Sequence, residues 1–217
     1  MTQTKSYFIR PFHKETLKPP REWPLDSVPW SQLRLKYNGQ LDLEIGCGVG
    51  QHPLLWAQQH PERYLVAIER TQEKYSKFAN AADKAALSNL LPVHADAIPW
   101  VSLLAPDETF ENIFILYPNP NPKNKSQRFF CMPFFQEILR VLKPKGYIHL
   151  ATNIVEYHKE AQEFGEKAWG LQQIQSLELN AANYGEYFPE FANLARTHFE
   201  KKYLARGETC YHLLLQK

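Results

Sequence analysis

LEIGCGVG, residues Leu43–Gly50, lies where an apolar stretch gives way to helix-forming residues. Gly46, Gly48 and Gly50 alternate with other residues in it. Glycine tolerates tight turns and lets a ligand approach the backbone, because it has no Cβ. The spacing G-x-G-x-G differs from the dinucleotide fingerprint G-x-G-x-x-G. The stretch predicts a strand-to-helix turn that can hold a ligand, although a bare glycine turn would look the same.

Outward from this turn, strand and helix patterns alternate along the chain. The predicted strands are 41–46, 64–69, 89–96, 112–117, 146–152 and 209–217, and the predicted helices are 52–60, 71–86, 129–142 and 156–169. Such alternation means a mostly parallel sheet with helices on both faces. Residues 1–38 are Pro-rich and show no periodicity, so we expect a basic N-terminal arm and one domain over 39–217.

The composition is that of a soluble globular protein, with 44% hydrophobic and 22% charged residues. The N-terminus has no apolar signal region, and no apolar run reaches the roughly 20 residues that span a bilayer. The cysteines Cys47, Cys131 and Cys210 form neither a metal-binding spacing nor an even disulfide set. We therefore expect a cytoplasmic protein with no membrane segment and no metal site.

Positive charge is concentrated in three parts of the chain. Residues 1–40 carry seven Lys and Arg against three Asp and Glu, residues 123–145 carry six against one, and residues 196–206 carry four against one. The net charge of the whole chain is only +2, so the remainder is acidic. Basic patches on an acidic body indicate an anionic partner such as nucleic acid, although ordinary solvated faces would give the same counts.

Three acidic residues surround the glycine turn in the predicted sheet. Glu69 ends the second strand, where a carboxylate accepts hydrogen bonds from both ribose hydroxyls of a nucleoside. Asp96 ends the third strand, beside the expected place of an adenine. Glu44 lies inside an apolar strand and is costly there unless paired, for example with the amine of a methionine moiety. Together they predict an S-adenosylmethionine pocket at the carboxyl ends of the strands.

The stretch LYPNPNPKNK, residues 116–125, follows the fourth predicted strand. Its prolines force an extended, stiff conformation. Asn119 and Asn121 are held in this loop, and Lys123 and Lys125 follow them. This arrangement predicts a rigid loop that leaves the end of a strand and holds two amides and several positive charges, although a stiff surface turn would look the same.

Over residues 38–217 the chain resembles the bacterial tRNA (guanine-N7)-methyltransferases, which are class I S-adenosylmethionine-dependent methyltransferases. LEIGCGVG, VAIER and HADA resemble the cofactor segments of that family in order and spacing. LKPKGYIHLATN is similar to its LKPGGxxHxxTD motif. RTHFEKKYLARGETCY resembles its C-terminal T-x-x-E-x-K stretch, which is the most specific match because no generic methyltransferase needs it.

The resemblance implies a Rossmann-like α/β fold with a mostly parallel, seven-stranded sheet and an antiparallel last strand. It implies S-adenosyl-L-methionine as the cofactor and tRNA as the partner. The expected function is methyl transfer to N7 of a guanine in tRNA. The oligomeric state stays open, with a monomer favoured.

The resemblance also assigns roles to individual residues. It implies cofactor binding by Glu44, Gly46, Gly48, Gly50, Glu69, Arg70, Asp96, Ala97 and Asn119. Asn119 is also the residue that it places at the reacting centre as a catalytic residue. It implies substrate binding by Lys123, Asn153, Thr197, Glu200 and Lys202. Lys125 and Arg128 are the expected contacts to the RNA backbone.

The chain departs from the family at two reacting positions, which makes it a divergent member. Asn119 and Asn153 stand where the family has Asp, and Asn121 stands where it has Trp. An amide keeps a hydrogen bond but loses the negative charge, and charge-assisted bonds are roughly twice as strong as neutral ones. Two other functions therefore stay open: an RNA methyltransferase with another target atom or base, and an RNA-binding protein that keeps the cofactor pocket without catalysis.

Overall fold

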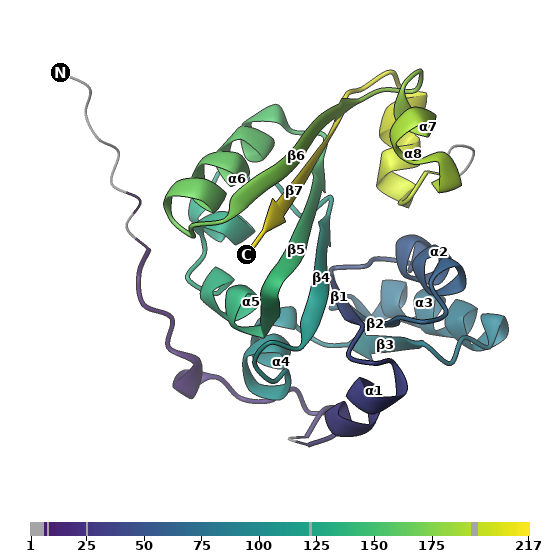
Figure 1. The fold of residues 1–217 in the computed structure, drawn as a ribbon, viewed down its shortest axis with the longest axis vertical. Helices are drawn as coiled ribbons and strands as arrows, with labels where there is room; N and C mark the ends of the chain where they lie inside the picture. The colour runs from purple at the N-terminus through teal and green to yellow at the C-terminus, as the bar shows by residue number, and fades with distance from the viewer. Residues whose placement is uncertain (1–6, 8, 25, 122, 192–194) are drawn as a thin grey trace.

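The computed structural model describes residues 7, 9–24, 26–121, 123–191 and 195–217, so residues 1–6, 8 and 25 of the expected arm lie outside the described residues. Within the described residues, seven strands form one sheet in the order β3-β2-β1-β4-β5-β7-β6 (Figure 1). They are β1 (Leu41–Ile45), β2 (Tyr64–Glu69), β3 (Leu90–His94), β4 (Phe110–Leu116), β5 (Leu142–Thr152), β6 (Gln172–Leu179) and β7 (Cys210–Gln216). β1 to β5 pair in parallel, whereas β7 is antiparallel to β5 and β6. The predicted fold class is confirmed.

Helices cover both faces of this sheet. They are α1 (Trp30–Lys36), α2 (Gln51–Gln59), α3 (Gln72–Ala85), α4 (Ala97–Leu104), α5 (Phe135–Val141), α6 (Val155–Lys167), α7 (Tyr184–Tyr187) and α8 (His198–Ala205). In Figure 1, α2 and α3 lie on one face, while α4, α5 and α6 lie on the other. α7 and α8 stand together beyond the end of the sheet. Within the described residues, no helix is long and apolar enough to cross a bilayer.

The central strands are buried because both of their faces are covered. Every residue of β1 and β2 is buried, and β1 also carries the carboxylate of Asp42. Arg63 pairs with that carboxylate through Nε and Nη2, each 2.6 Å from an Asp42 oxygen. A buried charge survives only when it is paired in this way. β1 is thus fixed in the core, and the glycine turn begins directly after it at Gly46.

The segment before residue 38 is only partly an arm. Trp30–Lys36 forms a helix, and Trp23 and Trp30 pack edge-on against Trp100, with ring centroids 6.1 and 5.9 Å apart. Tyr37 is buried in the same core. The expectation of an irregular segment is wrong here, because two helical turns are too short to show a periodicity. The tryptophans pack this stretch against the core that contains Trp100.

Edge strand β6 was not predicted from the sequence. It pairs with β7 alone, and its residues Gln172–Ser176 are all exposed. A register shift between Gln173 and Gln175 bends this edge. A strand that is exposed on both faces needs no alternation of apolar and polar residues, so the usual signal was missing. Helices α4 and α8 were also not predicted from the sequence.

Candidate cofactor and substrate site

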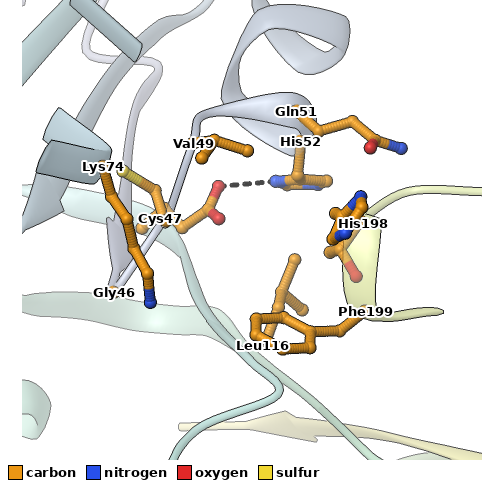
Figure 2. A pocket seen from close by; sticks show the side chains of 12 residues that line it. Gly46, Cys47, Val49, Gln51, His52, Lys74, Leu116, His198 and Phe199 are labelled. Atoms are coloured by element: carbon orange, nitrogen blue, oxygen red, sulfur yellow. Dashed lines mark hydrogen bonds and ion pairs between the residues drawn. The ribbon is translucent and has the colours of Figure 1, made fainter. Parts of the chain in front are cut away.

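A pocket opens at the carboxyl ends of β1 and β4, between the glycine turn and the first turn of α8 (Figure 2). Its lining residues are Glu44, Gly46, Cys47, Gly48, Val49, Gln51, His52, Lys74, Leu116, Thr197, His198 and Phe199. In Figure 2, Phe199 lies beside Leu116 across the cavity from Val49 and Cys47. Ligands in open α/β sheets bind at this end of the strands. Lys74, His198 and Phe199 are pocket residues that the sequence analysis did not single out.

The glycine turn leaves its backbone open toward a ligand. Gly46 and Gly48 have φ values of 78° and 62°, in the left-handed region that favours glycine. A Cβ added at either position would meet no atom within 4 Å. Gly50 serves packing instead, because a Cβ there would lie 2.0 Å from the Phe78 ring. The open backbone at the first two glycines fits a ligand that lies flat against the turn.

Glu69 ties the end of β2 to the glycine turn. Its Oε2 accepts a hydrogen bond from the Gly48 N–H at 2.9 Å, and its Oε1 accepts one from the Thr71 N–H at 2.7 Å. The side chain is nearly buried, in a residue only 6% exposed. Each carboxylate oxygen has a second lone pair. Glu69 can therefore brace the turn and still accept hydrogen bonds from a ribose.

Glu44 already has a partner within the protein. His52 Nδ1 lies 2.6 Å from Glu44 Oε2, and both side chains are 3% exposed (Figure 2). The His52 ring also packs against Phe114, with centroids 4.8 Å apart. The carboxylate therefore does not depend on a bound amine for compensation, as the sequence had suggested. His52 was missed because it stands eight residues away, in the first turn of α2.

Asp96 lies at the N-terminus of α4, outside the residues that line the pocket. Its carboxylate accepts a hydrogen bond from the Ile98 N–H at 2.9 Å and so caps the helix. Arg70 Nη1 approaches Asp96 at 3.9 Å, and Ala97 is the first residue of α4. Asp96 is thus a helix cap, while cofactor contacts by these three residues stay a prediction.

Asn119 holds the shape of the loop after β4. Its Oδ1 accepts a hydrogen bond from the Asn121 N–H at 3.0 Å, which is an Asx turn. Tyr117 and Asn121, on either side, have positive φ values of 51° and 41°. The Asn119 side chain is exposed and does not line the pocket. An aspartate would keep the same turn, because the bond uses only an acceptor oxygen.

Arg128 is buried, and its expected contact with RNA phosphates stays a prediction. Its Nε donates to the Pro120 carbonyl at 2.6 Å, and its Nη1 lies 3.2 Å from Glu160 on α6. Only 4% of the residue is exposed. The guanidinium therefore anchors the loop to α6. Lys123 and Lys125 on the same loop are exposed, as a phosphate contact requires.

Thr197 begins α8 and lines the pocket. Its Oγ1 accepts a hydrogen bond from the Glu200 N–H at 3.0 Å, so the T-x-x-E stretch starts as a helix cap. Lys202, further along α8, is exposed. The cap fixes the direction of the helix and brings the first turn of α8 over the cofactor end of the sheet.

Glu200 is fully buried, and its expected contact with the substrate stays a prediction. Its carboxylate accepts hydrogen bonds from Arg196 Nη2 at 2.6 Å, Tyr184 at 2.6 Å and Tyr117 at 3.0 Å. Burial by itself would raise the pKa of Glu200, but the Arg196 guanidinium holds that pKa below its usual value. Through these buried hydrogen bonds, Glu200 connects α8 to Tyr184 on α7 and to Tyr117 at the end of β4.

Asn153 follows the end of β5 and contacts an acid that the sequence analysis did not single out. Its Nδ2 donates to Glu208 Oε2 at 3.0 Å. Glu208 precedes β7, the antiparallel neighbour of β5. An amide and a carboxylate therefore stand side by side at the same end of the sheet as the pocket.

Aromatic rings extend from the pocket along α8. The Tyr117 ring lies 6.4 Å from Phe199 and 5.6 Å from Tyr203, and the Phe199 and Tyr203 rings are stacked at 6.3 Å. Phe199 is 41% exposed, which is unusual for so large an apolar side chain. We call these three residues the aromatic wall. Such a surface suits stacking of a nucleobase.

The cysteine in the pocket has no feature of a nucleophile. Burial, together with the carboxylates of Glu44 and Glu69, raises the pKa of the Cys47 thiol well above its usual value. Among the residues that the structure describes, no three His, Cys, Asp or Glu side chains gather where they would hold a metal ion.

Comparisons with known proteins agree with this geometry. A family model described as "putative methyltransferase" matches residues 38–213. Proteins named tRNA (guanine-N(7)-)-methyltransferase from Chromohalobacter salexigens, Nitrosomonas eutropha and Myxococcus xanthus are 31%, 30% and 30% identical over 78%, 81% and 83% of this chain. The matches span 66%, 75% and 85% of those relatives.

Solved structures show the same fold. A 16S rRNA methyltransferase, KamB, superposes with a TM-score of 0.64 at 20% identity over 89% of this chain and 94% of its own. A SAM-dependent methyltransferase from Aquifex aeolicus gives a TM-score of 0.56 at 15% identity over 87% and 89%. At such low identity these likenesses concern the fold alone.

Proposed function

Since the chain belongs to the tRNA (guanine-N7)-methyltransferase family, we infer that it transfers a methyl group from S-adenosyl-L-methionine to N7 of a guanine in tRNA. One observation carries the inference: the glycine turn and the first turn of α8, which begins the family's T-x-x-E stretch, line one pocket. A cofactor held by the turn would thus lie directly beside the segment that is specific to this family. We expect the enzyme to work in the cytoplasm.

The residues of the turn fit the cofactor. The open backbone at Gly46 and Gly48 receives it, and Glu69 accepts hydrogen bonds from its ribose hydroxyls. S-adenosyl-L-methionine supplies an electrophilic methyl group on a sulfonium. Asp96 and Ala97 lie at the end of β3, on the side where we place the adenine.

The protein contributes alignment rather than acid–base chemistry. Guanine N7 carries a free lone pair, so no base has to remove a proton from it. Rate enhancement then comes from holding N7 in line with the methyl group and from placing charge around the purine. We assign the stacking of the base to Phe199 and Tyr117 of the aromatic wall. Asn119 keeps the loop beside it in shape through the Asx turn.

Exposed cations near the site hold the RNA. Lys123 and Lys125 extend from the loop after β4, and Lys202 lies on the exposed side of α8. Phosphate contacts of this kind fix register and orientation without reading sequence. They also make binding depend on salt. With Arg128 anchored inside the protein, the loop has two exposed lysines for this purpose.

The test is methyl transfer from labelled cofactor to bulk tRNA, followed by mass spectrometry of the nucleosides. We expect 7-methylguanosine in tRNA that was incubated with the protein and not in tRNA incubated without it. A different methylated nucleoside would support another target atom or base. Binding of tRNA and cofactor with no methylated nucleoside at all would support the non-catalytic function.

A further inference from the structure

We propose that Glu208 receives the N1–H and amino edge of the target guanine, and that Asn153 positions its carboxylate. This inference rests on the proposed function. The two residues lie at the carboxyl end of β5, where Asn153 Nδ2 donates to Glu208 Oε2 at 3.0 Å. The contact places a negative charge next to the region that we assign to the base.

Glu208 is also attached to the aromatic wall. Its backbone N–H donates to the Tyr203 carbonyl at 3.0 Å, and the Tyr203 ring lies 5.6 Å from Tyr117. Burial raises the pKa of the Tyr203 hydroxyl, and the charge of Glu208 raises it further, as expected for neighbours. A purine stacked on the wall would therefore have this carboxylate near its edge.

Several other carboxylates at this end of the sheet already have partners or lie away from β5. Glu44 pairs with His52, and Glu200 is buried among Arg196 and two tyrosines. Glu69 braces the glycine turn. Asp96 is accessible, but it follows β3, at the edge of the sheet farthest from β5, β7 and β6.

Glu208 has the exposure and the acceptor capacity that this role needs. Its side chain is 38% exposed, and its Oε2 receives one hydrogen bond, from Asn153. Arg206 Nη1 lies 3.8 Å from Oε1, with its own side chain 56% exposed. An exposed ion pair of this length is weak, so a substrate can replace it. Lone pairs on both oxygens remain for two N–H donors side by side.

An amide at position 153 suits a carboxylate at position 208. The Asn153 Nδ2–H holds the Glu208 carboxylate in one orientation. An aspartate there would face Glu208 at a comparable distance and repel it, which would drive one of the two acids to take up a proton. The pair thus carries a single negative charge whose place is fixed by a neutral partner.

Guanine chemistry matches a fixed carboxylate. Its N1–H and exocyclic amino group are adjacent donors, whereas adenine has an acceptor at N1. A carboxylate therefore selects guanine. With adenine, the carboxylate oxygen that faces N1 would have no hydrogen-bond donor. Methylation at N7 makes the purine cationic, so a nearby negative charge stabilises the transition state more than the ground state.

The first experiment compares Glu208→Gln with the wild type. We expect kcat/KM for tRNA to fall at least tenfold, while the dissociation constant for the cofactor, measured by calorimetry, stays unchanged. Glu62→Gln is the matched control, because Glu62 is an exposed acid before β2, at the opposite end of the sheet. Its kcat/KM should equal that of the wild type.

The second experiment moves the charge across the hydrogen bond. The double variant Asn153→Asp/Glu208→Gln keeps one acid and one amide in contact. We therefore expect its kcat/KM for tRNA to be at least threefold higher than that of Glu208→Gln. Asn153→Asp alone should lower kcat/KM, because it sets two acids against each other. A purely structural role of the pair would show no recovery in the double variant.

The outcomes separate this inference from the function on which it rests. If the wild type forms no 7-methylguanosine in tRNA, the proposed function fails, and this inference with it. If the wild type is active and Glu208→Gln has the same kcat/KM, the inference alone is overturned. Should Glu208→Gln fail to fold, Glu208→Asp takes its place: we expect an intermediate kcat/KM, and a wild-type value would contradict the role.

Discussion

The guanidinium of Arg196 and the carboxylate of Glu200 lie 2.6 Å apart, with side chains 6% and 0% exposed. Tyr184 and Tyr117 donate to the same carboxylate. A contact so deeply enclosed cannot exchange its partner for a substrate without opening the protein. The glutamate of the T-x-x-E stretch is therefore a support for α8, and Thr197 at its start is the part that reaches the pocket.

Glu200→Gln should lower the free energy of unfolding by about 3–5 kcal/mol, because it leaves Arg196 buried without a compensating charge. Urea denaturation measures this value. Glu186→Gln, on the exposed side of α7, is the control and should change it by less than about 0.5 kcal/mol. Equal stabilities of the two variants would show that the buried pair does not hold the C-terminal part in place.

Glu69→Ala should weaken cofactor binding by about 1.5–3 kcal/mol, or roughly ten- to a hundredfold, because the ribose loses a charged acceptor. The turn also loses a brace, since the Gly48 and Thr71 N–H groups lose their acceptor. Isothermal calorimetry gives the affinity. Glu73→Ala, at an exposed acid in the first turn of α3, should bind as the wild type does. Unchanged affinity in a folded Glu69→Ala protein would remove Glu69 from the cofactor site.

Lys123→Ala/Lys125→Ala should weaken tRNA binding evenly across sequences. The slope of log K against log salt should flatten by about 0.7–0.9 for each lost phosphate contact. Lys84→Ala, at the exposed end of α3, serves as the control and should keep the parental slope. Arg128→Ala should instead lower the melting temperature, because its guanidinium is an internal anchor. A parental slope in the double variant would place the RNA elsewhere.

Asn119→Asp should keep the loop intact, because the Asx turn needs only an acceptor at Oδ1. The added negative charge favours a purine that becomes cationic, so turnover on tRNA should stay equal or rise. Asn119→Ala loses the acceptor and should lower turnover, with cofactor affinity unchanged. Single-turnover methyl transfer compares the three proteins. If the aspartate variant were as slow as the alanine variant, the side chain would have a role beyond the turn.

Stability should fall in acid because of His149 and His212, whose imidazoles lie in a desolvated environment. Burial, with the charges of Arg196, His52 and Arg63, lowers the pKa of His149 to about 3, and burial also lowers the pKa of His212 well below its usual value. The unfolded chain then binds more protons below about pH 6.5. The contribution of these histidines to the free energy of unfolding is complete above that pH. It decreases toward pH 3, by at most about 1.4 kcal/mol per pH unit for each histidine.

Denaturant titrations at several pH values measure the slope of the free energy of unfolding against pH. His149→Gln should flatten it, because Asn112 then faces an amide that does not titrate in this range. His13→Gln, at an exposed histidine, should leave it as it is. A stability that does not change between pH 6.5 and 5 would contradict the burial of neutral imidazoles.

The parts of the fold that the sequence predicted are those that bury apolar surface, from the strands beside the glycine turn to the last strand β7. β1 and β2 are buried strands rich in apolar residues, and the turn between β1 and α2 follows from its glycines. β6 was missed because its exposed residues need no pattern. The helix α1 was missed because two helical turns are too short to show a periodicity, and Trp100, against which Trp30 packs, is distant in the sequence.

The site was harder to predict because charge alone does not reveal burial. Arg128 and Glu200 look like solvent-facing ligands in the sequence, yet their partners lie inside the protein. Glu160 is 32 residues beyond Arg128, and Tyr117 is 83 residues before Glu200. Such pairings depend on how helices pack, which no local pattern records. The Glu208 contact of Asn153 was missed for the same reason, since it joins the ends of two neighbouring strands.

The pocket combines the early glycine turn with the late first turn of α8, and this has a consequence for biosynthesis. A nascent chain emerging from the ribosome completes β1 to β5 well before residue 197 is translated. The cofactor cavity is closed only when the last segment folds back across the sheet. Ligand binding stabilises a protein only in the state that binds. A bound cofactor therefore stabilises the finished chain and not a chain that ends before α8.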